Sequence, residues 1–438
     1  MNDARGLAVS GASAKALEVY ERALRALNIY RGDPLAIIDE ALGAQPDFAM
    51  GHILRAQVQV TMWERSVLPG IRESVTQLEA LEGAMNDRER RHAGALKAWA
   101  AGDWQRHRDE LGNLLAEYPR DLLALQVAHL ADFFHADRES LRDRVARAMP
   151  GWSREDDSYG LLLGMHAFGL EENGAYPKAE EAGHTALHYD AEDCWAQHAV
   201  AHVLEMQSRQ SEGIQFMELR TKNWAQADNG FAFHNWWHTA LYHLDQGRPQ
   251  RALEIYDAGI RPQANELRLM MLDAAALLWR MHLRRMNVGK RWEELAASYG
   301  KGNENGFYAF NDMHAMMAFV ATGRSREAAS LLKAVEASAR EGNTNGRMAR
   351  EAGLVIVRAI EAFGREDYAE VVSLLAPVRD TARIIGGSNA QRDVLERTLL
   401  EAALRAGDKA LARTLAEERV AHKPLCPFSQ ELRSRAMQ

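Results

Sequence analysis

The sequence predicts an all-α protein, a right-handed superhelix of stacked antiparallel helix pairs. Three observations predict it. Helical runs are separated by short glycine-centred breaks, alanines follow many breaks at helix-contact spacing, and long strand-like alternation is missing. Small residues at contact positions let paired helices pack closely, and a period in the mid-thirties is typical of helical-repeat arrays. Half-buried strands would instead alternate apolar and polar residues.

The glycine breaks mark the repeats along the chain. Gly102 and Gly174 lie 72 residues apart, and Gly247 follows after 73, so each step is close to two helix pairs of about 36 residues. The later breaks are 41 and 43 residues apart, which predicts longer or looser C-terminal units: Gly323, Gly364 and Gly407.

Two polar segments interrupt the helical pattern without dividing the chain. Residues 302–306 and 341–346 are rich in Gly and Asn and predict loops between units, not linkers between separate domains. We therefore expect a single continuous array over residues 1–438. Its sub-blocks are expected at 1–150, at 151–300 with most of the informative histidines, and at 301–438.

Composition and charge limit the classes of partner and the location that the sequence predicts. The chain has 53 basic and 61 acidic residues, a net charge of −8, which predicts no nucleic-acid partner. No window of 18 apolar residues occurs, so no membrane span or membrane partner is expected. No signal peptide is apparent, and Cys194 and Cys426 form no disulfide framework. These features predict a cytoplasmic protein.

Histidines repeat at the period of the array. His166, His202 and His238 are successive steps of 36 residues. His129 lies 37 residues before His166, and His314 lies 76 after His238, which is two steps of 38. Residues one period apart occupy equivalent places in neighbouring repeats. The spacing therefore predicts a row of imidazoles along one surface.

Two of these histidines have a second histidine on the same helix face. His198 and His202 stand at i and i+4, as do His234 and His238, and Glu205 shares the face of His202. Four imidazoles and a carboxylate are the ligand types of Zn²⁺ or a similar divalent metal. The candidate metal ligands are His198, His202, Glu205, His234, His238 and His314. The same groups could share protons as a general acid/base cluster.

The alternative is that these histidines are packing residues hydrogen-bonded to neighbouring repeats. A zinc-protease helix is excluded, because that motif needs Glu directly after its first His. Ala199 and Asn235 occupy those places.

Aromatic, amide and acidic side chains accompany the histidines and complete a candidate ligand site. Its residues are His129, His166, Asn235, Trp237, Asp312 and Arg392. Acids near the same register, such as Asp312 and Asp273, could instead cap helices or hydrogen-bond between repeats. The Gly386–Ser388 turn favours an N-capped loop over an anion site, because it lacks the longer phosphate-loop pattern.

From residue 164 to 257 the chain resembles the tetratricopeptide repeat protein 38 family. The resemblance rests on Gly164–Glu172, His198–Met206 and His234–His238 and extends in outline over most of the chain. It implies a helical-repeat fold of tetratricopeptide type and assigns no reaction. Asn389 departs from the family pattern, where a His would also suit, so the resemblance assigns position 389 no role.

The sequence therefore predicts a helical-repeat protein that binds a small molecule or peptide in a concave groove lined by His, Trp and acidic residues. The alternative is a metal-dependent or His acid/base enzyme of hydrolase type with its site in that groove. A scaffold whose histidines only pack is a third class. Catalytic residues, and whether the protein is an enzyme, stay undetermined at this level.

Overall fold

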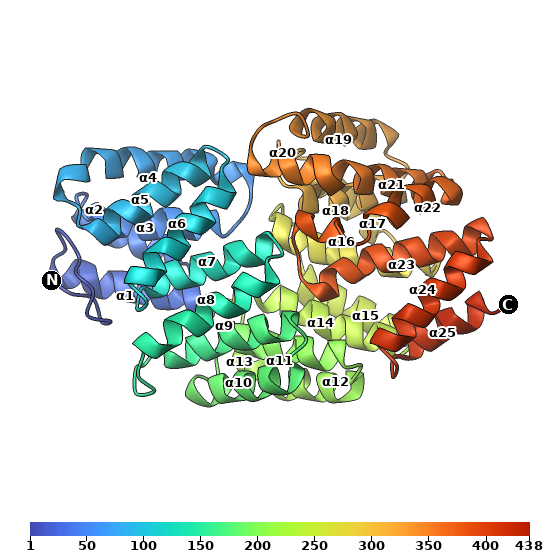
Figure 1. The fold of residues 1–438 in the computed structure, drawn as a ribbon, viewed down its shortest axis with the longest axis horizontal. Helices are drawn as coiled ribbons and strands as arrows, with labels where there is room; N and C mark the ends of the chain where they lie inside the picture. The colour runs from blue at the N-terminus through green and yellow to red at the C-terminus, as the bar shows by residue number, and fades with distance from the viewer. The chain divides into compact units, whose positions relative to one another are not determined.

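The computed structural model describes all 438 residues, and the chain is all-α, as expected (Figure 1). Two isolated β-bridges, Asn2 with Ala8 and Arg31 with Asn229, lie outside the helices, and no sheet forms. The chain divides into two compact units, residues 1–200 with 223–231 and residues 201–222 with 232–438. The division falls inside helix α11, and the expected sub-blocks stay predictions. The single continuous array stays a prediction.

The first unit is built from consecutive helices that pack against their sequence neighbours. Short turns join them, so neighbouring helices run antiparallel. Its helices are α1 (Ala14–Ile29), α2 (Pro34–Ala44), α3 (Ala49–Val60), α4 (Leu68–Ala80), α5 (Asp87–Ala100), α6 (Trp104–Glu117), α7 (Leu122–Phe134), α8 (Arg138–Ala148), α9 (Tyr159–Glu172), α10 (Tyr176–Tyr189) and the start of α11 (Cys194–Met206).

The second unit continues the same pattern after α11. Its helices are α12 (Gln210–Leu219), part of α13 (Thr221–Trp224), α14 (Ala232–Asp245), α15 (Pro249–Ile255), α16 (Arg268–Leu283), α17 (Arg291–Tyr299), α18 (Ala309–Ala321), α19 (Ser325–Ser338), α20 (Thr344–Met348), α21 (Leu354–Gly364), α22 (Tyr368–Leu375), α23 (Asn389–Ala406), α24 (Lys409–His422) and α25 (Pro427–Ala436). Here α14, α16 and α18 pack in succession, and α23 also contacts α16.

Five of the six predicted breaks turn the chain through a left-handed glycine, the conformation that glycine adopts without a Cβ penalty. The φ angles of Gly102, Gly174, Gly247, Gly323 and Gly407 lie between 65° and 83°. Each separates two paired helices, such as α9 from α10 and α14 from α15. The repeat period read from the sequence is therefore a period of helix pairs.

The sixth break works differently. Gly364 is the last residue of α21, and Glu366 takes the left-handed conformation in its place. A Cβ at Gly364 would lie 2.6 Å from the Cβ of Val320 on α18. Gly364 therefore allows two helices to approach closely and does not itself form the turn.

The polar segments behave largely as loops. Residues 302–306 connect α17 and α18, whereas α20 begins inside the 341–346 segment at Thr344.

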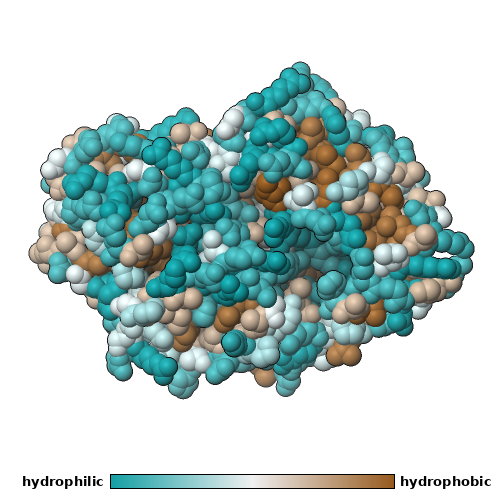
Figure 2. All heavy atoms as spheres, viewed as in Figure 1, coloured by the Kyte–Doolittle hydropathy of each residue, from teal (hydrophilic) through white to brown (hydrophobic).

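The face in Figure 2 is mostly hydrophilic, with a hydrophobic patch at the upper right. None of the helices is both long and apolar enough to span a membrane.

Candidate metal centre

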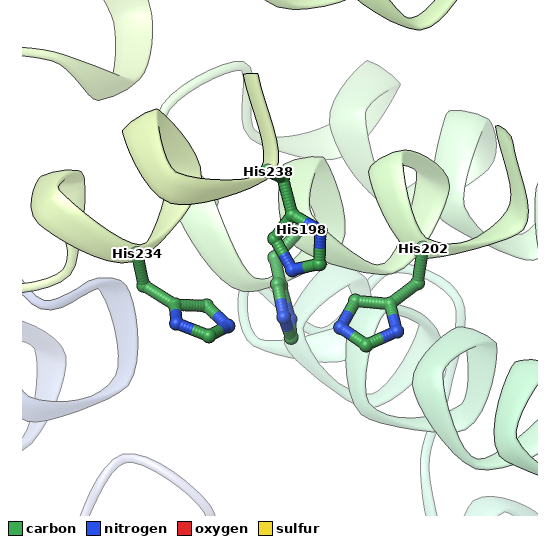
Figure 3. A group of neighbouring side chains, drawn as sticks. All are labelled: His198, His202, His234 and His238. Atoms are coloured by element: carbon green, nitrogen blue, oxygen red, sulfur yellow. The ribbon is translucent and has the colours of Figure 1, made fainter. Parts of the chain in front are cut away.

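Four histidines from two helices converge in the interior. His198 and His202 lie one turn apart on α11, and His234 and His238 lie one turn apart on α14 (Figure 3). One ring nitrogen from each falls within 4.8 Å of the others, and all four side chains are buried. The rings of His202 and His238 are 4.4 Å apart between centroids. The i, i+4 spacing therefore delivers both imidazoles of each helix to one place.

Two carboxylates fix the orientation of the α14 imidazoles. Nδ1 of His238 hydrogen-bonds Oε2 of Glu205 at 2.8 Å, and Nδ1 of His234 hydrogen-bonds Oδ2 of Asp273 at 2.6 Å. A carboxylate accepts only, so each Nδ1 carries the hydrogen and each Nε2 carries the lone pair. Metal-binding histidines are typically oriented by such a carboxylate, which also makes the imidazole more basic.

Two cationic side chains, Lys423 and Arg280, lie close to residues that contact the histidines. The Lys423 ammonium is 3.8 Å from Oε1 of Glu205, and the Arg280 guanidinium lies 5.3 Å from the Trp237 ring. Glu205 thus faces an imidazole with one oxygen and an ammonium with the other. Trp237 in turn stacks on the His234 ring at 5.3 Å between centroids.

His238 is neutral in this environment. Burial lowers its pKa well below 6.5, and His202, His234, Arg280 and Lys423 lower it further by repulsion. An imidazole must be neutral to coordinate a metal, so these surroundings keep the lone pair of His238 available at neutral pH.

The spacing of the ring nitrogens is close to what a metal ion needs. Zn²⁺ binds imidazole nitrogen at about 2.0–2.1 Å, so ligand nitrogens around a tetrahedral ion lie about 3.3 Å apart. The four nitrogens here lie within 4.8 Å of one another. Side-chain shifts of roughly 1 Å would close the set around one ion. An all-imidazole site suits Zn, Cu, Ni or Fe better than Mg or Ca.

The other two predicted metal ligands, Glu205 and His314, lie outside the group of four convergent histidines. Glu205 orients His238 and is not one of the convergent ligands. His314 is buried on α18, where its Nδ1 donates to the carbonyl of Phe310 at 2.8 Å, and burial lowers its pKa to about 4. His314 therefore shares the repeat spacing of the histidines without belonging to the four-histidine group.

The two histidines at the start of the ladder belong to the first unit. His129 on α7 is buried, and its Nε2 accepts from the indole N–H of Trp195 at 3.2 Å. Burial lowers the pKa of His129 to about 3. His166 on α9 is only half-buried, and burial also lowers its pKa. Within the first unit, these two positions fit the packing alternative.

Of the predicted ligand-site residues, Asn235 and Trp237 are buried on α14 beside the histidines. Asp312 accepts from the backbone N–H of Gly306 at 2.9 Å and so fastens the loop before α18. Arg392 donates to Oδ1 of Asn389 at 2.8 Å and to the carbonyl of Gly387. Asp312 is also buried, Arg392 is half-buried, and the ligand site that these residues would form stays a prediction.

The turn before α23 is the N-capped loop that the sequence favoured. The Ser388 hydroxyl accepts from the backbone N–H of Gln391, and the Gln391 side chain accepts from the Ser388 N–H. This reciprocal pair is a capping box. Asp273 likewise proves to be a hydrogen-bond partner between repeats, through His234.

Sequence reasoning missed the contribution of Lys423, which lies 218 residues after Glu205. No local pattern signals that contact. Asp273 carried a signal, because it falls 35 residues after His238, one repeat period along. Its role as the orienting carboxylate of His234 depends on packing between α14 and α16.

Solved structures share the helical-repeat arrangement. The human IFIT1 dimer with m7Gppp-AAAA is 12% identical, with 96% of this chain and 94% of that chain covered and a TM-score of 0.46. Yeast Tom70 is 13% identical over 96% and 86% of the two chains, with a TM-score of 0.32. The P58(IPK) TPR domain is 12% identical over 90% and 98%, with a TM-score of 0.21. No protein-family model matches the chain. The all-α, helical-repeat fold of this chain rests on its own succession of paired helices.

One expectation about partners is corrected by these comparisons. The human IFIT1 dimers contain m7Gppp-AAAA and PPP-AAAA, and the prediction of no nucleic-acid partner is withdrawn for this chain. That prediction rested on a net charge of −8. Net charge is a sum over the whole surface, whereas an RNA contacts a local patch, so the sum does not exclude such a partner.

Proposed function

We propose that this protein binds a divalent transition-metal ion through His198, His202, His234 and His238 and uses it to hold a small ligand. The observation that carries the proposal is the pair of carboxylate-oriented imidazoles, His238 with Glu205 and His234 with Asp273. Metal coordination requires oriented imidazoles, and a carboxylate orients each of these two.

The site favours a small molecule over a peptide. Trp237, Asn235 and the four histidines are all buried, and several have no exposed surface at all. A peptide needs an open groove along which its backbone can lie. A small ligand can instead be enclosed beside the metal.

A His acid/base enzyme is the second candidate, because a carboxylate-oriented imidazole is also the arrangement of a general base. The low pKa of His238 argues against it. A base whose pKa lies well below the working pH removes protons poorly, whereas its lone pair still coordinates metal.

The test is metal content of untagged protein purified without chelators, measured by inductively coupled plasma mass spectrometry. We expect about one equivalent of Zn, Ni, Cu or Fe, and its loss from His202→Ala and His238→Ala. The matched control is His243→Ala, a buried histidine on α14 outside the group. Metal-free protein after soaking in each ion, or equal loss from the control, would refute the proposal.

We further propose that the resemblance to the tetratricopeptide repeat protein 38 family reflects membership. His198–Met206 and His234–His238 carry both the resemblance and the candidate site. Metal binding would then be a property of the family, and the metal content of another member would test it. We also propose a cytoplasmic location, because a reducing compartment suits the buried thiols of Cys194 and Cys426.

A further inference from the structure

Four buried polar atoms near the histidines have no hydrogen-bond partner in the protein. They belong to the second unit and are Nε1 of Trp237, Oδ1 of Asp273, Nε of Arg280 and Nε2 of His314. Each side chain is at most 1% exposed. Buried polar atoms usually have a hydrogen-bond partner, so these four are candidate contacts for a ligand.

Arg280 is the most costly member of this set. Its two terminal nitrogens donate to the carbonyls of Ala276 and Ala390, at 3.0 and 2.8 Å, and its guanidinium lies over the Trp237 ring. The carboxylates that influence it, Glu205 among them, act through space and not through an ion pair. Burial lowers its pKa to about 10, so it is still charged at neutral pH. A buried guanidinium without a carboxylate partner is a recognition group for an anion.

The side chains that carry these atoms are linked to the metal centre and to one another through α14, α16 and α18. Asp273 and Arg280 are seven residues apart on α16, which places them on one face of the helix. Asp273 holds His234 through its other oxygen, and Trp237 stacks on the same ring. His314 lies on α18, which packs on α16, and Arg280 lowers its pKa by repulsion.

Their chemistry is complementary. Trp237 Nε1 and Arg280 Nε are N–H donors. Oδ1 of Asp273 is an acceptor, and so is Nε2 of His314, because its Nδ1–H already donates to Phe310. A partner that satisfies all four atoms must therefore offer an anionic acceptor at one end and a donor nearby.

We propose that the metal-bound protein takes a small carboxylic acid bearing a hydroxyl or amino group on its α-carbon. The carboxylate accepts from Arg280 and Trp237, and the hydroxyl or ammonium donates to Asp273 or His314. The inference rests on the proposed function, because the ligand lies beside the metal ion. It adds the chemical class of that ligand.

The probe is glycolate, the smallest acid of this class, titrated into Co²⁺-loaded protein while the visible absorption of cobalt is recorded. Acetate lacks the hydroxyl and glycolamide lacks the charge, so both are matched comparisons. We expect glycolate to bind at least tenfold more tightly than either, because each analogue leaves buried groups unpaired. Equal affinity for the three compounds would overturn the proposal.

Arg280→Met tests the anion contact directly. We expect at least a hundredfold loss of glycolate affinity, with the Co²⁺ spectrum of the ligand-free protein unchanged and the Tm equal or higher. Replacing an unpaired buried charge with an apolar side chain of similar size is often neutral or stabilising. Arg285→Met is the control, because Arg285 is exposed and lies two residues after the end of α16. If Arg280→Met does not fold, Arg280→Lys keeps the charge without the planar fork and should lose at least tenfold.

The Co²⁺ absorption spectrum and the Tm together distinguish failure of the ligand proposal from failure of the metal proposal. A normal Co²⁺ spectrum with no response to glycolate would refute the ligand class and leave the metal proposal standing. The absence of a Co²⁺ spectrum would refute the metal proposal. A rise in Tm of metal-free protein with glycolate, abolished by Arg280→Met, would then still support the carboxylate site. No rise would overturn it.

Discussion

Glu205→Gln is the sharpest perturbation of the candidate metal centre, because it changes charge with little change of shape. The amide oxygen can still accept from Nδ1 of His238, which lies 2.8 Å from the present carboxylate. The substitution removes the negative charge that raises the basicity of the imidazole. Loss of an outer carboxylate of this kind typically weakens metal binding by about 10–100-fold, or about 1.4–2.8 kcal/mol.

The structure places the expected loss toward the upper end of that range. The Lys423 ammonium, 3.8 Å from Glu205, loses its counter-charge in the variant and then repels the bound dication. Lys423→Met in the Glu205→Gln background should therefore recover part of the lost affinity. A double-mutant cycle of the two substitutions isolates this coupling.

The assay is competition for Zn²⁺ between the protein and a chromophoric chelator at pH 7.5. Glu218→Gln is the control, because Glu218 lies 3.8 Å from a histidine outside the group, His243. A Glu205→Gln affinity within twofold of the control would refute the reasoning, since the carboxylate would then have no influence on the ion.

Three further predictions concern the whole protein. Burial lowers the pKa of His107 and His129 to about 3, whereas both titrate near 6.5 when unfolded. The unfolded state therefore binds more protons below pH 6.5, and each residue should lower the free energy of unfolding by about 2 kcal/mol by pH 5. Urea titrations at pH 7.5 and 5 would reveal this, and a pH-independent midpoint would contradict it. Gly364→Ala should destabilise by about 1–3 kcal/mol through its clash with Val320, whereas Gly43→Ala, with open space around it in α2, should stabilise by about 0.5–1 kcal/mol. Thermal melts that rank the two alanine variants the other way would count against the packing. Chelation should lower the Tm, because an ion at a hundred times its Kd contributes about 2.7 kcal/mol; unchanged melting of metal-loaded protein would argue against a folded-state site.

The repeat architecture could be predicted from the sequence because its signal is periodic. Left-handed glycines recur where each helix pair turns, and their spacing is visible in one dimension. The two i, i+4 histidine pairs were also predictable, since one helix face is set by the 3.6-residue turn. Both signals are local, or repeat at a fixed interval.

Which of the periodic histidines come together in the site was harder to predict, for a geometric reason. A period identifies equivalent positions in successive repeats, but packed helices lie about 8–10 Å apart. An ion bound at about 2 Å reaches only adjacent members of such a ladder. His314 is two steps beyond His238 and is not among the four convergent histidines. Contacts such as that of Lys423 follow from how distant helices pack, which no spacing encodes.

The contact between Glu205 and Lys423 also has a consequence for biosynthesis. The histidines of α11 and α14 are translated long before the lysine, which is 218 residues behind the glutamate. At roughly 5–20 residues per second, a ribosome needs about 11–44 s to cover that distance. Once His238 has been translated, 33 residues after Glu205, the nascent chain holds the complete set of imidazoles while the glutamate still lacks its ammonium neighbour. The half-made protein therefore has a more negative environment for a cation than the finished one, and completion of the C-terminal helices weakens that attraction.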